Sequence, residues 1–197
     1  AATITVTTND PRIVADGQCS LVEAIVNANN DAATHADCRA GSGVDTIVLP
    51  ANASIMLSNP YVTLYSTPFG TTVSSTPAGL PRITSQITIE GNGATMTRQG
   101  NAPAFGLIDV RGNFDLLGSR VNPGDLTLQG LTLSGGSSFG GLSNNGTLRI
   151  KNSTISGNTG LGVNNNYRAA LTIENSTISG NRGGGVHNYY GTLTVAN

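Results

Sequence analysis

Two segments of this chain are nearly identical at a spacing of 23 residues, and this repetition constrains the fold more than any other feature. Residues 148–158 read LRIKNSTISGN, and residues 171–181 read LTIENSTISGN. A fixed internal period is typical of repeat architectures, in which one supersecondary unit is stacked many times. Looser copies of the segment lie at 126–135 and from Leu193 onward. A second element, Gly-x-x-Asn, also recurs once per period and ends at Asn144, Asn165 and Asn188.

Each repeat alternates apolar and polar residues and then breaks at a Gly- or Asn-rich corner. This period of 2 predicts short β-strands. A repeat of about 22 residues cannot bury its apolar side alone, but repeats stacked about 4.8 Å apart share one core. A leucine-rich repeat would need a helix or an extended segment after its strand, where this chain offers only Gly and Asn. We therefore predict an all-β fold, a right-handed parallel β-helix of about 22–23 residues per coil. The expected core residues are Leu148, Ile150, Ile155, Leu171, Ile173, Ile178, Leu193 and Val195.

The corners are expected to stack asparagines between coils. Asn tolerates left-handed backbone angles, and stacked amides can form hydrogen-bonded ladders. We expect Asn144, Asn165 and Asn188 to form one such column. A second column, with amides that lean inward, is expected from Gly130, Asn152 and Asn175, whereas Asn158 and Asn181 are interpreted as surface turn residues.

Residues 19–50 differ from the repeats. Apolar residues at helical spacing predict a helix from Ser20 to about Asn29, with Ser20 as its N-cap and Glu23 at the capping-box position. Cys19 and Cys38 are the only cysteines, and they could be a free pair, half of a metal site or a disulfide. We favour a disulfide, which would clamp the helix across the first coil and would imply an oxidising compartment.

The whole chain is predicted to be one domain. Residues 1–50 form an N-terminal cap and the first strands, residues 51–95 form irregular early coils with a long loop at 58–82, and residues 96–197 form regular coils with an open C-terminal end. The chain begins at Ala1-Ala2 and enters a strand pattern at once, as is typical after removal of a signal peptide. We therefore expect an extracellular or cell-surface protein.

The cap carries a family resemblance. The segments CSLVEAI at 19–25, DC at 37–38 and DTIVLP at 45–50 resemble the N-terminal region of CSLREA-type bacterial secreted β-helix proteins, although Val22 stands where that group usually has Arg. The repeats are similar to those of pectin-lyase-like folds and, more weakly, to those of polymorphic outer-membrane proteins. The resemblance implies the β-helix fold and a bacterial extracellular or surface location, often with further repeats and an anchor.

Enzymes of the pectin-lyase-like superfamily place carboxylates and basic residues on adjacent coils of one face. Outside the cap the carboxylates are Glu90, Asp109, Asp115, Asp125 and Glu174, and no two share a column at the same register. Asp109 is the best single candidate, but its place between Ile108 and Val110 predicts an outward, solvated side chain. The basic candidates are Arg149, Lys151, Arg168 and Arg182, and the only histidine in the coils is His187, interpreted as a surface residue. We expect Lys151 to pair with Glu174 one coil later. No catalytic set, metal site or cofactor site is predicted.

Three tyrosines, Tyr167, Tyr189 and Tyr190, fall near one another at corners of adjacent coils. They could contact a carbohydrate by stacking, or they could simply pack the corner. The net charge is −1 with a single Lys, so a nucleic-acid partner is not expected, and no apolar run approaches the roughly 20 residues of a membrane span.

These observations predict a non-catalytic extracellular or cell-surface scaffold: an adhesin stalk, a filament subunit or the passenger of a larger anchored protein. The alternative is a polysaccharide lyase or glycoside hydrolase. The uncapped strand Thr192–Val195 would expose unpaired backbone, so we expect either further repeats after it or head-to-tail pairing with another subunit.

Overall fold

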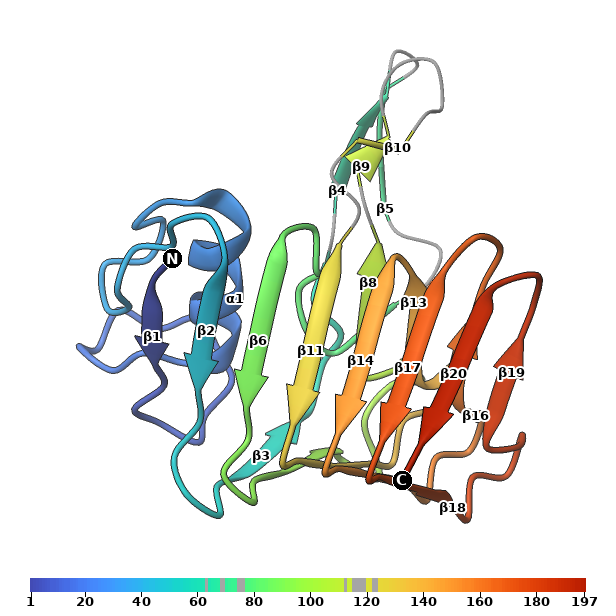
Figure 1. Cartoon of the computed structure of the whole chain (residues 1–197). Helices are drawn as coiled ribbons and strands as arrows, with labels where there is room; N and C mark the ends of the chain where they lie inside the picture. The colour runs from blue at the N-terminus through green and yellow to red at the C-terminus, as the bar shows by residue number, and fades with distance from the viewer. Residues whose placement is uncertain (63, 68–69, 74–76, 112, 115–119, 122–123) are drawn as a thin grey trace.

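The computed structural model describes residues 1–62, 64–67, 70–73, 77–111, 113–114, 120–121 and 124–197. Within these residues the chain is mostly β-strand, arranged in parallel sheets, with one short helix (Figure 1). The expected all-β character is thus confirmed. For residues 64–67, 70–73, 113–114 and 120–121 only the pairing of the strands is described. Asp115 lies outside the described residues.

Three parallel sheets build the body. The seven-stranded sheet has the order β1 (Thr3–Thr5), β2 (Asp45–Val48), β6 (Gln86–Glu90), β11 (Asp125–Gln129), β14 (Thr147–Lys151), β17 (Ala170–Glu174) and β20 (Thr192–Ala196). The five-stranded sheet contains β3 (Ser54–Leu57), β7 (Thr95–Arg98), β12 (Thr132–Ser134), β15 (Thr154–Ser156) and β18 (Thr177–Ser179). The four-stranded sheet contains β8 (Ile108–Arg111), β13 (Gly140–Asn145), β16 (Leu161–Asn165) and β19 (Val186–Asn188). In the later part of the chain, each repeat therefore supplies one strand to each sheet in turn.

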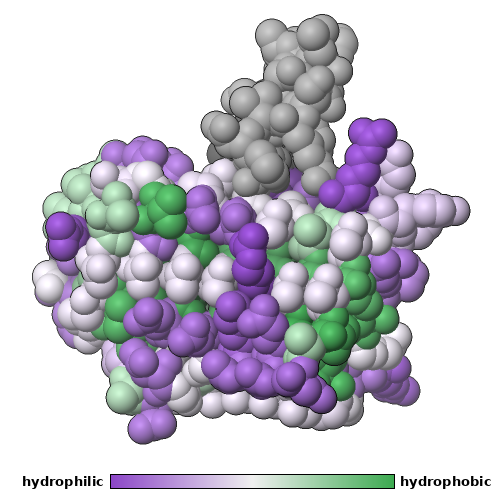
Figure 2. Space-filling model, viewed as in Figure 1, coloured by the Kyte–Doolittle hydropathy of each residue, from purple (hydrophilic) through white to green (hydrophobic). Residues whose placement is uncertain are grey.

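The strand register follows the sequence repeat. In the seven-stranded sheet Leu148 pairs with Leu171 and Ile150 pairs with Ile173. These four side chains are buried, as the period-2 alternation predicts. The outward face of the same sheet is mostly polar (Figure 2).

The core prediction is wrong for the last strand. Leu193 and Val195 lie in the register of the inward columns, yet their side chains are 39% and 65% exposed. The physical reason is that, among the described residues, β20 pairs with β17 alone, and no other described strand covers its far side. Ile178 on β18 is only partly buried, as expected for another strand at the edge of its sheet.

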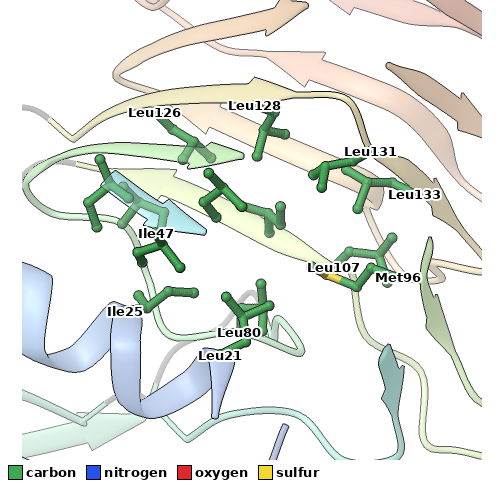
Figure 3. Close-up of a cluster of buried hydrophobic side chains, with 14 of the residues drawn as sticks. Leu21, Ile25, Ile47, Leu80, Met96, Leu107, Leu126, Leu128, Leu131 and Leu133 are labelled. Atoms are coloured by element: carbon green, nitrogen blue, oxygen red, sulfur yellow. The ribbon is translucent and has the colours of Figure 1, made fainter. Parts of the chain in front are cut away.

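The predicted helix is present as α1 (Leu21–Asn30). Ser20 caps it in a capping box: the Glu23 backbone N–H donates to the Ser20 hydroxyl at 3.2 Å, and the Ser20 N–H donates to the Glu23 carboxylate at 2.9 Å. The inner face of α1 places Leu21 and Ile25 against the apolar interior of the sheets (Figure 3). The helix therefore covers the N-terminal end of the core.

The expected disulfide joins Cys19 to Cys38, whose Cα atoms are 4.7 Å apart. It ties the residue before the N-cap to the loop that follows α1. Both cysteines are buried in the same hydrophobic cluster as the helix.

Two antiparallel hairpins interrupt the repeats. The first, β4 (Leu64–Thr67) with β5 (Gly70–Val73), occupies part of the segment predicted as a long loop at 58–82. The second, β9 (Asn113–Phe114) with β10 (Arg120–Val121), lies within the stretch predicted as regular coils. Both hairpins project from the side of the body on which the strands of the seven-stranded sheet begin (Figure 1).

One asparagine column forms as predicted. Asn144, Asn165 and Asn188 are in register, and their amides donate in series, from Asn144 Nδ2 to Asn165 Oδ1 at 2.8 Å and from Asn165 Nδ2 to Asn188 Oδ1 at 2.7 Å. Asn144 and Asn165 are fully buried. The ladder gives the buried amides partners that an apolar corner would lack.

The other asparagine predictions are wrong in whole or in part. Gly130, Asn152 and Asn175 do form a column of left-handed corner residues, but Asn152 and Asn175 are exposed, so their amides do not lean inward as predicted. Asn158 is instead buried: its Nδ2 donates to Asn181 Oδ1 at 2.8 Å, and its Oδ1 accepts from the Gly136 N–H at 2.8 Å. The side-chain direction at a corner depends on the local φ and ψ angles, which the residue type alone does not fix.

Candidate functional site

The three predicted carbohydrate-contact residues lie together at one corner of the last two repeats. The rings of Tyr189 and Tyr190 meet edge to face with centroids 4.7 Å apart, and the Tyr167 and Tyr190 rings do so at 6.4 Å. Their side chains remain half to three-quarters exposed, at 51% for Tyr167, 52% for Tyr189 and 75% for Tyr190. A corner that only packed against the body would bury these rings, so this aromatic surface is accessible to a ligand.

Two further side chains enlarge the surface. The His187 ring stacks on Tyr189 at a centroid distance of 6.3 Å, and its Nδ1 lies 3.1 Å from Asn164 Oδ1. The Arg168 guanidinium lies over the Tyr167 ring at 4.9 Å, within cation–π range. We call these five residues, Tyr167, Arg168, His187, Tyr189 and Tyr190, the aromatic corner.

The repeat itself positions this aromatic corner. The turn from β16 to β17 carries Tyr167 and Arg168, and the turn from β19 to β20 carries Tyr189 and Tyr190. The Arg168 N–H donates to the Tyr190 carbonyl at 3.2 Å, so the two turns are stacked directly. The buried amide of Asn165 supports both turns from inside. It donates to the Ala169 carbonyl in the first turn, and to Asn188 Oδ1 and the Thr192 carbonyl on either side of the second.

The backbone of the aromatic corner is strained. Arg168 and Tyr190 have φ angles of +59° and +50°, in the left-handed region that bulky residues rarely adopt. Such a conformation costs about 1–3 kcal/mol and persists only where the surroundings enforce it. Gly or Asn would fit both positions with less strain, so the choice of Arg and Tyr there points to a role for the side chains themselves.

Chemically, the aromatic corner offers ring faces and ring edges beside a guanidinium and an imidazole. The rings can cover apolar C–H faces of a ligand, while Arg168 and His187 can hydrogen-bond to its polar rim.

Asp109, the best single catalytic candidate in the sequence, is not a solvated surface residue. Its side chain is 2% exposed, and its Oδ2 accepts from Arg82 Nε at 3.0 Å and lies 3.6 Å from Arg111 Nε. The prediction is wrong because strand alternation shows which way Asp109 points but not what covers it. Here Arg82 covers it, from the segment that pairs with β8 at the Ile83–Val110 bridge.

The electrostatics of this buried cluster are dominated by desolvation. Burial lowers the pKa of the Arg82 guanidinium from its ordinary value, and the neighbouring Asp109 carboxylate opposes that shift. Within the described part of the chain, neither Asp109 Oδ1 nor Arg111 Nε has a hydrogen-bond partner. A carboxylate held in this way between two guanidiniums is suited to an ion pair rather than to proton transfer with a substrate.

The remaining charged candidates form the cross-strand pairs expected of an outer face. Lys151 Nζ lies 3.0 Å from Glu174 Oε2, which confirms that predicted pair, and Arg149 Nη1 lies 2.6 Å from Asp125 Oδ1. Each partner is between about a quarter and two-fifths exposed, so each pair contributes at most about 1 kcal/mol. The structure therefore brings these four candidates together only as two exposed ion pairs. Arg182 is exposed beyond β18, and Glu90 lies partly buried in β6. The register places Glu90 in the same column as Glu174, through Gln129 and Lys151, so the prediction that no two of these carboxylates share a column is wrong.

Sequence reasoning missed the membership of Arg168 in the aromatic corner and the role of Arg82 and Arg111 beside Asp109. Arg168 could have been found, because it directly follows Tyr167. Arg82 lies 27 residues from Asp109 in a diverged segment, and no repeat pattern connects the two.

In the described part of the chain, no three His, Cys, Asp or Glu side chains gather in an arrangement suited to a metal ion. The same residues contain no helix with the length and apolar character needed to cross a membrane. No family model, curated protein or solved structure matches the chain.

Proposed function

We propose that this chain is a right-handed parallel β-helix that acts as a non-catalytic extracellular or cell-surface scaffold and presents the aromatic corner to a carbohydrate. The observation that carries the proposal is the aromatic corner itself, in which rings from two stacked turns stay exposed on a strained backbone.

The sheet order supports the solenoid part of the proposal. Successive repeats add one strand each to the three parallel sheets, and the register advances by one repeat at every step. A chain that visits three parallel sheets in turn needs no long crossover helix, which agrees with α1 being the only helix of the described residues. The disulfide between Cys19 and Cys38 favours an oxidising, extracellular compartment.

The scaffold role follows from rigidity. The buried amide ladder and the continuous apolar core hold each turn against the next, so an exposed ring at a corner is preorganised and loses little conformational entropy on binding. The neutral and cationic groups of the aromatic corner suit a neutral or acidic polysaccharide.

The test measures retention on insoluble polysaccharides and affinity for soluble oligosaccharides by isothermal titration calorimetry. The change Tyr190→Gly should relieve the left-handed strain, so the protein should unfold no earlier than the wild type while its affinity falls about tenfold or more, or about 1.4 kcal/mol. Val62→Ala is the matched control, since Val62 is also a largely exposed apolar residue, at 64% against 75% for Tyr190, and lies outside the aromatic corner.

Loss of binding in Tyr190→Gly with full stability would support the proposal. Equal binding by wild type, Tyr190→Gly and Val62→Ala would refute it, as would failure of the wild type to bind any of a panel of neutral and acidic glycans.

The exposed end of the sheets is part of the same proposal. Leu193 and Val195 present apolar side chains there, and one side of the β20 backbone has no partner strand among the described residues. We propose that strands of a neighbouring molecule add at this end, because an uncovered edge of this kind templates β-pairing. α1 and the cap loops lie at the opposite end and would hinder simple head-to-tail stacking at that end.

A further inference from the structure

A second unpaired strand edge lies at the opposite end of the five-stranded sheet. β3 is the terminal strand there and pairs only with β7. The carbonyls of Ala53 and Leu57 accept hydrogen bonds from the β7 side, from Thr95 N–H and Gln99 N–H, both at 2.8 Å. Since successive residues of a strand direct their peptide groups to alternate sides, Ser54 and Met56 direct theirs away from β7. No described residue makes a backbone hydrogen bond to these groups.

This edge lacks the usual protection against added strands. β3 has the sequence Ser-Ile-Met-Leu, without a charge or a proline, and the Met56 side chain is 53% exposed. Edge strands normally carry a lysine, a proline or a bulge that discourages pairing. An unprotected edge of four residues is therefore available to another strand.

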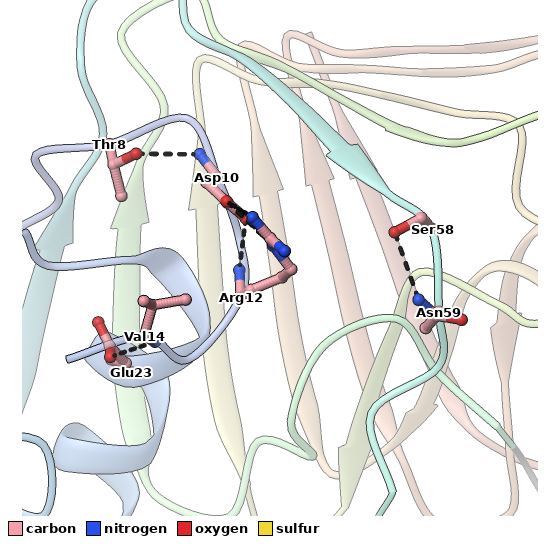
Figure 4. A network of polar contacts seen from close by, with 7 residues as sticks. All are labelled: Thr8, Asp10, Arg12, Val14, Glu23, Ser58 and Asn59. Atoms are coloured by element: carbon pink, nitrogen blue, oxygen red, sulfur yellow. Dashed lines mark hydrogen bonds and ion pairs between the residues drawn. The ribbon is translucent and has the colours of Figure 1, made fainter. Parts of the chain in front are cut away.

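The chain that leaves β3 continues directly into an apolar groove of about 190 Å³. It is lined on one side by the loop that contains Pro11 and Ile13 and on the other by the segment that runs from Leu57 to Tyr61 (Figure 4). The buried residues Val22 and Gly79 also line it. Ile13 lines the groove, and the sequence neighbours of three lining residues, Val14, Met56 and Val62, are also large and apolar. All four are more than two-fifths exposed. The volume is that of about six water molecules, at roughly 30 Å³ each, which suits one aliphatic or aromatic side chain.

The rim of the groove is polar but electrically balanced. Arg12 Nε donates to both carboxylate oxygens of Asp10 at 3.0 Å, and these hydrogen bonds lower the pKa of the Asp10 carboxyl, so the pair stays charged at neutral pH. Across the groove, Asn59 Nδ2 donates to Ser58 Oγ at 3.5 Å (Figure 4). A ligand that follows this rim therefore meets hydrogen-bonding groups without net charge.

We propose that β3 and this groove together bind an extended, uncharged peptide, which adds to the sheet as an edge strand and places one bulky apolar side chain in the groove. Ser54 and Met56 each offer one free N–H and one free C=O, and the two residues are two positions apart along the strand. Only the backbone of another extended strand has donors and acceptors at that spacing. The apolar walls of the groove favour a bulky apolar side chain of the peptide. The rim has no net charge, so it disfavours a charged peptide residue next to that side chain. This binding is separate from the carbohydrate contact proposed above.

The experiment uses fluorescence anisotropy with the full chain and four fluorescein-labelled, capped heptapeptides. Each peptide alternates threonine with valine and carries leucine, isoleucine, methionine or phenylalanine at its centre. At least one should bind saturably, and its backbone N-methylated version should not. Met56→Pro removes one free donor without breaking a bond to β7, and proline is tolerated on an edge strand, so the affinity should fall about tenfold while the unfolding temperature stays near that of the wild type.

Ile13→Asp introduces a charge at the groove wall and should weaken binding by a similar factor. Met56→Ala removes the same side chain as Met56→Pro but keeps the backbone N–H, so it should bind about tenfold more tightly than Met56→Pro. The proposal is overturned if none of the four peptides binds, or if Met56→Pro binds as tightly as Met56→Ala. It is also overturned if Thr194→Pro in β20, rather than Met56→Pro, abolishes binding, because the peptide would then add at the other end of the molecule.

Discussion

The buried ion pair between Arg82 and Asp109 allows a sharp test of what holds the early repeats together. Arg82→Met removes the guanidinium that lies 3.0 Å from Asp109 Oδ2, and it leaves a carboxylate that is 2% exposed facing only Arg111 at 3.6 Å among the described residues. Removing one partner of a buried pair costs about 3–5 kcal/mol, because the remaining charge has lost its solvation and its counter-charge. For a domain of this length that corresponds to a fall in unfolding temperature on the order of 10 °C.

The second half of the test replaces both charges. The double change Arg82→Met with Asp109→Leu removes the carboxylate as well, so most of the lost stability should return, since apolar replacements of a buried pair are often neutral. Urea unfolding followed by circular dichroism measures the free energy of unfolding for each variant. The control is Arg149→Met, which breaks the half-exposed pair with Asp125 and should cost no more than about 1 kcal/mol.

Two results would refute this reasoning. If Arg82→Met cost no more than Arg149→Met, the pair would not behave as buried. If the double variant were as unstable as the single one, the loss would come from packing of the long arginine side chain and not from the unpaired charge.

Four further predictions follow from the described contacts. Ile173→Ala should cost about 2–5 kcal/mol in urea unfolding as a buried cavity, whereas Val195→Ala, 65% exposed in the last strand, should cost less than about 1 kcal/mol; the reverse order would place the core on the wrong face. Replacing both Cys19 and Cys38 by Ala should lower the free energy of unfolding by roughly 3 kcal/mol in the chain-entropy model, and non-reducing mass spectrometry of the wild type should find no free thiol. Purified protein should release no ultraviolet-absorbing unsaturated products from pectin or alginate, with or without calcium, and a sustained release would favour the lyase alternative. Light scattering should detect association of the chain at high concentration, and Thr194→Pro should suppress it without unfolding the earlier repeats, because each repeat contacts only its neighbours; a wild type that stays monomeric would exclude assembly through β20.

Much of the architecture follows from the sequence because the physics involved is local or periodic. The 23-residue spacing sets which strands pair, and the structure keeps that register between β14 and β17. Alternation decides which residues point inward, so Ile150 and Ile173 are buried as predicted. The helix could be predicted for the same reason, since Ser20 and Glu23 satisfy backbone groups within the first turn of α1.

At the corners, the period of the sequence does not predict whether a side chain is buried. Asn152 and Asn158 both occur in the repeated segment, yet Asn152 is exposed at φ +47° and Asn158 is buried. The φ and ψ angles at each corner set the direction of the side chain. The stacking of the repeats then determines whether the amide has a hydrogen-bond partner in the next repeat. The grouping of Tyr167 with Tyr190 was predictable from the period, whereas the exposure of the rings depends on how the two turns pack.

The sequence by itself determined the repeat, the strand register, the inward face, the capped helix and the candidate tyrosines, because each rests on neighbours in the chain or on a fixed period. Only the tertiary structure decided that Asp109 is buried with Arg82, that Leu193 and Val195 remain exposed, and that β3 borders an apolar groove. Alternation states the side of a strand on which a residue lies, but burial depends on what covers that side. The covering segments come from parts of the chain that share no period with the strand they cover.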